Sequence, residues 1–250
     1  MTPSSRPGRH ALRVATPVVA ALSGLLFLFL AACASTSPGA PAEAWQAPAS
    51  LDPVSTTQWE ADMARFADED ARHPPPERPV VFAGSSSFRM WASLADDFPG
   101  VPVINRGFGG SQVRDLAWHA DAVAIRYRPR MVLLYAGDND IDAGRSPDQV
   151  LADTRVLVSR LRASLPQATI AWVSIKPSPL RIDQLPAQRE ANALVEAWLR
   201  TQPGTVYIDV TTPMLDVDGR PREELFIDDR LHMNADGYAI WREAVASALR

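Results

Sequence analysis

Val80-Val81-Phe82-Ala83-Gly84-Ser85-Ser86-Ser87 is an apolar run that ends abruptly in a glycine and three serines. Two later stretches have the same form, with Asn105-Arg106-Gly107-Phe108-Gly109-Gly110-Ser111 after Val101–Ile104 and Gly137-Asp138-Asn139-Asp140 after Met131–Tyr135. Short apolar runs rich in Val and Ile are typical of strands that are covered on both faces of a parallel sheet. Each run therefore predicts a buried strand whose carboxyl end carries glycine and polar residues.

Strands and helices are expected to alternate along the rest of the domain. A first helix is predicted from Gln58 to about Arg72, and Pro74-Pro75-Pro76 ends it. The predicted strands are Pro79–Ala83, Val101–Asn105, Met131–Ala136, Thr169–Ser174 and Val206–Asp209. The predicted helices between them are Gln112–Ile125, Pro147–Leu165 and Ala187–Thr201, followed by a last helix capped by Asn234. This order predicts an α/β fold, a three-layer α/β/α sandwich around a five-stranded parallel sheet.

A carboxylate and an imidazole stand three residues apart in Asp229-Arg230-Leu231-His232, just before the last helix. Across one tight turn Asp229 can reach Nδ1 of His232, which leaves Nε2 free to take a proton. Three histidines lie beyond the N-terminal leader. Of these, His73 lies against prolines and His119 falls within a predicted helix, so elimination favours His232 as a base. Together with a serine at a strand end, this pair indicates acyl-transfer chemistry.

The four polar segments occur in the order and contexts of the four sequence blocks of the SGNH (GDSL-like) hydrolases, and residues 79 to 250 resemble that family. The resemblance implies a flavodoxin-like sheet, Ser86 as the nucleophile, and Asp229 and His232 as the other members of a catalytic triad. It also implies an oxyanion hole formed by the backbone N–H groups of Ser86 and Gly110 and the side-chain amide of Asn139. No metal or organic cofactor is implied, and the expected substrate is a carboxylic ester, with either a short acyl group such as acetyl or a lipid acyl chain.

Two residues depart from the family pattern. Ser85 replaces the aspartate of Gly-Asp-Ser-Leu, and Asp138 adds a carboxylate between Gly137 and Asn139. Phe88 occupies the place of the second glycine in Gly-x-Ser-x-Gly, which argues against the α/β-hydrolase nucleophile elbow. The departures at Ser85 and Asp138 leave the class of ester substrate open.

Each segment also has a plainer interpretation. The serines after Gly84 can cap a helix or cradle a phosphate, which would make the chain a lipid-tethered binding module without turnover. A structural envelope lipoprotein is a third interpretation, but it gives Asn139 and His232 no role. The aromatic and apolar residues after the nucleophile (Phe88, Met90 and Trp91) can line an acyl pocket, although core packing is favoured. Lys176 and Arg181 can border the site, although a solvated loop is favoured.

The first residues have the form of an export signal. Three arginines (Arg6, Arg9 and Arg13) precede an apolar core from Val14 to Ala32, and Leu30-Ala31-Ala32-Cys33 resembles a bacterial lipobox. We therefore expect a signal peptide over residues 1–32 and a lipid anchor on Cys33, with an uncleaved membrane helix as the alternative. Ala34 after the cysteine favours the outer membrane, facing the periplasm.

A tether follows the predicted anchor. Residues 33–57 are rich in Pro, Ala, Ser and Thr and predict a flexible connection, and residues 58–250 are expected to form one hydrolase domain. Cys33 is the only cysteine, so the domain can contain no disulfide. The formal charge of −4 becomes about −7 without the leader arginines, which disfavours nucleic acid as a partner. The expected partners are an ester substrate and a membrane, and the oligomeric state stays open.

Overall fold

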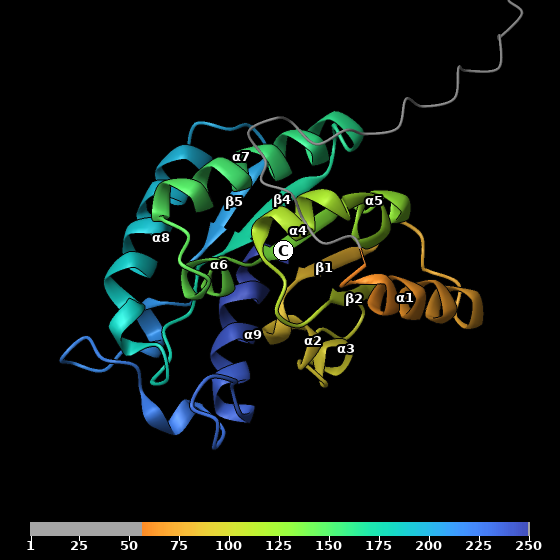
Figure 1. Cartoon of the computed structure of the whole chain (residues 1–250). Helices are drawn as coiled ribbons and strands as arrows, with labels where there is room; N and C mark the ends of the chain where they lie inside the picture. The colour runs from red at the N-terminus through yellow and green to blue at the C-terminus, as the bar shows by residue number, and fades with distance from the viewer. Residues whose placement is uncertain (1–56, 250) are drawn as a thin grey trace, which may run out of the picture. The chain divides into compact units, whose positions relative to one another are not determined.

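The protein is described from a computed structural model, which defines residues 57–249. Its five strands form one sheet in the order β2-β1-β3-β4-β5 (Figure 1), and all neighbouring strands are parallel. The strands are β1 (Val80–Gly84), β2 (Val103–Gly107), β3 (Met131–Tyr135), β4 (Thr169–Val173) and β5 (Thr205–Ile208). This order is that of flavodoxin-like sheets, so the predicted fold class is confirmed.

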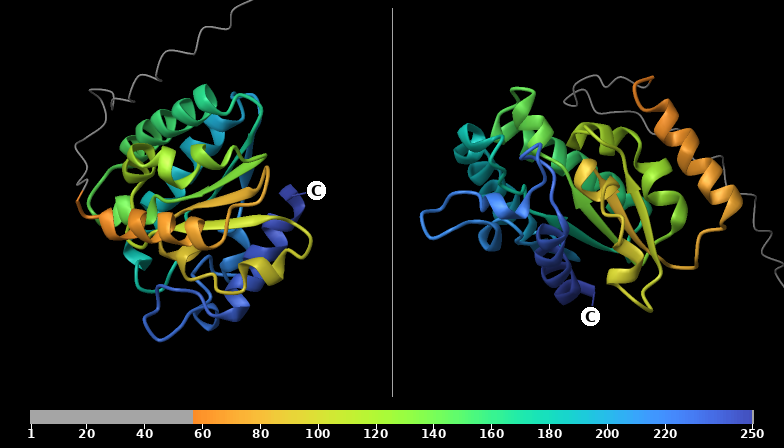
Figure 2. Two further views of the ribbon diagram at one scale, coloured as in Figure 1. Left: turned by 90° about the vertical axis from the view of Figure 1, so that its right-hand side faces the viewer. Right: turned by 90° about the horizontal axis from the view of Figure 1, so that it is seen from below.

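Helices cover both faces of the sheet (Figure 2). One layer contains α1 (Glu60–Arg72), α4 (Val113–Trp118), α5 (Ala120–Val123), α7 (Pro147–Ser164) and α8 (Leu185–Leu199), and the other contains α2 (Ser86–Arg89), α3 (Leu94–Asp97) and α9 (Ala235–Leu249). A short helix, α6 (Asp138–Asp142), follows β3, and 3₁₀ turns occur at Ile125–Tyr127, Ile182–Gln184, Thr212–Met214 and Glu223–Leu225. None of the helices within residues 57–249 has both the length and the apolar character that crossing a membrane requires.

Alternate strand residues build the core beneath α2, α3 and α9. Phe82 on β1 packs edge-to-face on Phe88 and Trp91 of the α2 segment, and Trp241 of α9 packs on Tyr135 at the end of β3. Every one of these aromatic side chains is at most 2% exposed. Because aromatic pairs of this kind add to the free energy gained by burial, this cluster fixes α2 against the carboxyl end of β1.

The predicted helix over Gln112–Ile125 is interrupted in the structure. It divides into α4, α5 and a 3₁₀ turn, with His119 between the two α-helices. Arg160 of α7 donates hydrogen bonds to the carbonyl groups of Ala117 and Trp118, and the N–H of Ala122 turns to His119 instead. A guanidinium from a distant helix therefore replaces the helical donors, and no Gly or Pro marks the break.

The sheet brings the polar strand ends together. Gly84 of β1 is in register with Gly107 of β2 and Tyr135 of β3, so the residues that follow these strands start at one edge. A Cβ atom on Gly84 would lie 2.4 Å from the carbonyl oxygen of Tyr135, closer than any side chain allows. The glycine thus permits the backbone of β3 to approach β1 closely just before the serines, and ligands of open parallel sheets bind beyond this edge.

Candidate active site

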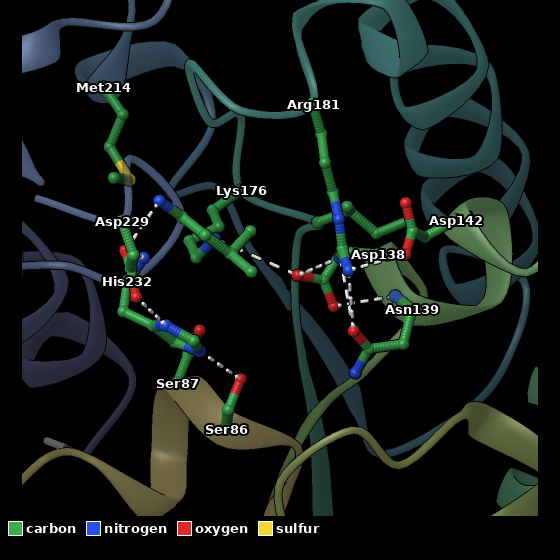
Figure 3. Close-up of polar contacts among 12 residues, drawn as sticks. Ser86, Ser87, Asp138, Asn139, Asp142, Lys176, Arg181, Met214, Asp229 and His232 are labelled. Atoms are coloured by element: carbon green, nitrogen blue, oxygen red, sulfur yellow. Dashed lines mark hydrogen bonds and ion pairs between the residues drawn. The ribbon is translucent and has the colours of Figure 1, made fainter.

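Ser86 lies at the start of α2, directly after β1. Its Oγ atom is 2.9 Å from Nε2 of His232, although the two residues are 146 positions apart (Figure 3). Ser86 is partly exposed, whereas its neighbours Ser85 and Ser87 are buried. Of the three serines after Gly84, only Ser86 is therefore both accessible and paired with an imidazole.

Asp229 contacts the other side of the His232 ring. Its Oδ2 atom is 2.6 Å from Nδ1, and its Oδ1 atom accepts the backbone N–H groups of Leu231 and His232 at 2.9 and 2.8 Å. Burial acts to raise the pKa of Asp229, but the hydrogen bonds from His232 and Leu231 outweigh it and lower the pKa to about 2. The carboxylate is thus ionised at neutral pH, which favours the imidazole tautomer with its proton on Nδ1 and a lone pair directed at Ser86.

The loop that carries Asp229 and His232 is closed at its base. Phe226 and Met233 form an antiparallel bridge, and the N–H of Ile227 donates to the carbonyl of His232 at 2.9 Å. Asn234 caps α9 as predicted, since its Oδ1 accepts the N–H groups of Asp236 and Gly237. These contacts fix the conformation of the loop between the 3₁₀ turn Glu223–Leu225 and α9.

Gly110 and Asn139 follow the ends of β2 and β3. Gly110 has a φ of +87°, a conformation that glycine adopts without strain. The Nδ2 group of Asn139 donates to the carbonyl oxygen of Ser111, the residue after Gly110, at 3.1 Å, while its Oδ1 faces Arg181. The structure therefore brings Ser86, His232 and Asp229 into one hydrogen-bonded chain and holds Asn139 against the Gly110 turn.

The prediction that Lys176 and Arg181 belong to a solvated loop is wrong. The side chains of Lys176 and Arg181 are 1% and 10% exposed, and both face Asp138 in α6, whose Oδ2 lies 3.9 Å from Nζ of Lys176 and 3.2 Å from Nη1 of Arg181 (Figure 3). Burial lowers the pKa of Lys176 to about 8, and the charge of Asp138 opposes the shift. The carboxylate that departs from the family pattern is thus buried and offset by cations.

A signal for these two residues was present in the sequence. Asp138 comes two residues after a strand predicted to be buried, and a buried carboxylate needs a charged or hydrogen-bonding partner. Lys176 and Arg181 follow the next predicted strand, and the carboxyl ends of neighbouring parallel strands meet at one edge. This combination indicates an ion cluster more strongly than the prolines between Lys176 and Arg181 indicate an exposed loop.

The residues after the nucleophile divide between core and surface. Phe88 and Trp91 are buried in the aromatic cluster under α9, as the favoured interpretation predicted, whereas Met90 is 37% exposed. Phe88 and Trp91 are therefore packing residues. Within residues 57–249, no group of three or more His, Cys, Asp and Glu side chains is arranged to hold a metal ion.

The buried Asp140, one residue after Asn139, should make the free energy of unfolding of the protein depend on pH. It is fully buried and accepts the N–H of Val113, and burial raises its pKa to about 7 despite that bond. Because the folded state holds this proton more tightly than the unfolded chain does, the contribution of Asp140 to stability is fully present below pH 4 or so and is lost as the pH rises through about 7. Asp140→Asn retains an acceptor for Val113, so we expect its free energy of unfolding to fall less than that of the wild type between pH 5 and pH 8.

Urea unfolding at both pH values measures this difference. The exposed Asp148 at the start of α7 provides the matched control, since Asp148→Asn should follow the wild-type pH dependence. If Asp140→Asn followed it too, Asp140 would not be the titrating group.

Residues 56–240 match the GDSL-like Lipase/Acylhydrolase family, and the chain therefore belongs to this family, the SGNH hydrolases. Membership favours the hydrolase interpretation over the phosphate-binding module. No protein with a curated description matches the sequence.

Solved structures share the fold at low sequence identity. A GDSL-like lipase from Bacteroides thetaiotaomicron is 22% identical with a TM-score of 0.65, over 75% of this chain and 97% of that one. A carbohydrate esterase of family 3 from Talaromyces cellulolyticus is 17% identical with a TM-score of 0.54, over 68% and 95% of the two chains. A variant of an acetyl-xylooligosaccharide esterase from Geobacillus is 16% identical with a TM-score of 0.55, over 68% and 93%.

Proposed function

We propose that the protein is a serine esterase that cleaves carboxylic esters through an acyl-enzyme on Ser86. The observation that supports this most directly is the continuous chain from Asp229 through both ring nitrogens of His232 to Oγ of Ser86, with heavy-atom distances of 2.6 and 2.9 Å. Both distances lie in the range of hydrogen bonds that transfer or orient protons. Each of the three residues is the type that the family pattern requires at its position.

The reaction would proceed in two halves. Nε2 of His232 takes the proton of Ser86 as Oγ attacks the ester carbonyl, and the resulting imidazolium then protonates the departing alcohol. Water enters, gives a proton to the same nitrogen and attacks the acyl-enzyme, which releases the acid and restores Ser86. Asp229 holds the ring in one orientation and stabilises its cationic form.

Three donors would stabilise the oxyanion: the backbone N–H groups of Ser86 and Gly110 and the amide of Asn139. The Nδ2 group carries two protons, and its bond to Ser111 uses one of them. The other can serve the substrate. Asn139→Ala should therefore lower kcat ~10²–10³-fold with little change in KM, measured on a chromogenic ester. The proposed role of Asn139 would be wrong if this variant retained wild-type kcat.

The substrate is proposed to carry either a lipid acyl chain or a short acyl group such as acetyl. Three large apolar side chains exposed near the site favour a lipid acyl chain: Met90, Leu180 and Ile227. The backbone N–H of Met90 donates to the carbonyl of Ser86 at 2.8 Å, and that of Leu180 donates to the carbonyl of Arg230 at 3.0 Å. Similarity to an acetyl-xylooligosaccharide esterase keeps a short acyl group in consideration. Saccharides and lipids are thus both candidate alcohol portions.

Hydrolysis of p-nitrophenyl acetate, butyrate and octanoate by the purified protein tests the proposal, together with labelling of Ser86 by a fluorophosphonate. Labelling at Ser86 with turnover of any ester supports the mechanism, and the chain-length profile chooses between the two acyl classes. Absence of both labelling and turnover would contradict a serine esterase.

The site is proposed to operate in the bacterial cell envelope. The signal peptide over residues 1–32, the lipidated Cys33 and the tether over 33–57 lie outside the described residues except at Thr57, and they stay predictions. The lipobox-like Leu30–Cys33 supports an outer-membrane anchor that faces the periplasm. Mass spectrometry of the mature protein tests this, since an unmodified Cys33 would exclude the anchor.

A further inference from the structure

Arg181 contacts the oxygen of the Asn139 side chain on the side away from the Gly110 turn. Both of its terminal nitrogens lie 3.2 Å from Oδ1 of Asn139, while Nδ2 of the same amide donates to Ser111 (Figure 3). The amide is thus held at both ends. Arg181 comes from the segment after β4, so a second loop, 42 positions away in the sequence, contacts the oxygen of the Asn139 amide.

The guanidinium is itself fixed by carboxylates from α6. Nη1 lies 3.2 Å from Oδ2 of Asp138, and Nη2 donates to Oδ2 of Asp142 at 3.0 Å. Gln184 donates to the other oxygen of Asp142 at 2.7 Å. Because the Arg181 side chain is only 10% exposed and its terminal nitrogens already bond three α6 residues, it faces protein groups and has little surface left for substrate.

We propose that Arg181 is a positioning residue that holds the Asn139 amide with its N–H groups toward the oxyanion. This inference rests on the proposed function of Asn139. An amide side chain has nearly the same shape after its oxygen and nitrogen exchange places, so packing alone cannot select one orientation. A guanidinium only donates hydrogen bonds, so Arg181 favours the oxygen of the Asn139 amide on its side, while the carbonyl of Ser111 accepts from the N–H end.

The charge of Arg181 has a second effect. In the exchanged orientation the amide oxygen would face the oxyanion and repel it, and two sets of N–H donors would face each other in a largely buried place. A hydrogen bond from a cation to Oδ1 also polarises the amide, which makes its remaining N–H a stronger donor to developing negative charge. The contacts with Asp138 and Asp142 hold the cation against α6.

A purely structural role for Arg181 would be to fasten its loop to α6, and a double-mutant cycle with Asn139 separates the two roles. We expect Arg181→Ala to lower kcat by about 10- to 100-fold with little change in KM, because it disturbs one oxyanion donor without removing it. In the Asn139→Ala background the same substitution should change kcat by less than about 3-fold, since residues acting through one group are not additive.

Arg189 provides the matched control. It is an arginine of α8, and its contact with the carbonyl of Gly219 at 2.9 Å is exposed, so Arg189→Ala should leave kcat unchanged. Arg181→Lys should recover only part of the loss, because one ammonium cannot span the three partners that the planar guanidinium reaches. If Arg181→Ala does not fold, the cycle is completed with Arg181→Lys.

The rate of Ser86 labelling by the fluorophosphonate gives a second readout of the same cycle. Equal fold losses of kcat and labelling rate in the wild-type and Asn139→Ala backgrounds would overturn the positioning role. Unchanged kcat in Arg181→Ala would overturn it as well. Either result would leave the proposed esterase function intact. Ester hydrolysis at the wild-type rate by Ser86→Ala would instead contradict the esterase function and say nothing against the role of Arg181.

Discussion

Ser86→Ala is expected to lower kcat/KM on p-nitrophenyl esters by at least ~10⁴-fold, because no acyl-enzyme can form without Oγ. The remaining rate would come from substrate binding and the proposed oxyanion donors. His232 keeps its bond to Asp229 in this variant, and the lost hydroxyl is small and partly exposed, so thermal stability should change little. Steady-state kinetics with a thermal unfolding curve for each variant measures both effects.

Ser85→Ala is the matched control for the loss of Oγ. Its hydroxyl is buried and has no hydrogen-bond partner among the described residues, so its removal should leave kcat/KM within a few-fold of the wild type. Each variant removes one serine hydroxyl, and the two positions are neighbours in the same turn. Equal activity of Ser86→Ala and Ser85→Ala would show that Ser86 is not the nucleophile.

Asp229→Asn should lower kcat by about 10⁴-fold while the loop keeps its shape. The amide oxygen of the new side chain can still accept the backbone N–H groups that Oδ1 accepts now, from Leu231 and His232. Its NH₂ group would replace Oδ2 beside Nδ1 and donate to it. This stabilises the tautomer with the proton on Nε2, which cannot take the proton of Ser86.

Asp228→Asn tests whether charge alone explains such a loss. Asp228 is an exposed carboxylate one residue earlier, so the variant removes the same charge from the same loop without touching the imidazole. We expect wild-type kcat for Asp228→Asn. If Asp228→Asn lost as much kcat as Asp229→Asn, the negative charge of the loop would explain the effect, and the orientation of the His232 ring would not. Measurement of kcat for both variants at pH 7.5 distinguishes the two explanations.

Local patterns predicted the elements that position the site. All five strands were predicted, with ends that shift by up to two residues, as for β2, which runs from Val103 to Gly107 instead of Val101 to Asn105. Apolar runs closed by glycine are strong signals because a strand covered on both faces tolerates few polar residues. The Asp229–His232 contact was predictable for a similar reason, since three residues and one turn fix its reach.

Features that depend on distant partners were not predictable in this way. The break at His119 results from Arg160 of α7, and the burial of Arg181 results from carboxylates on α6. Arg181 stands in a proline-rich segment whose own composition favours exposure, and tertiary packing brings both arginines to acceptors on other elements. Interpretation of each segment by its own composition therefore misplaces such long cationic side chains, and the signal for Arg181 lay in its combination with Asp138 at the neighbouring strand end.

The two contacts of His232 differ in how the chain secures them. The contact with Asp229 spans three residues inside a loop that the Phe226–Met233 bridge closes, whereas the contact with Ser86 spans 146 residues and requires that loop to rest on α2. A partial detachment of the loop would separate base from nucleophile and leave the acid–base pair whole. We therefore expect heating to break the contact between His232 and Ser86 before the contact between His232 and Asp229, and before the sheet unfolds.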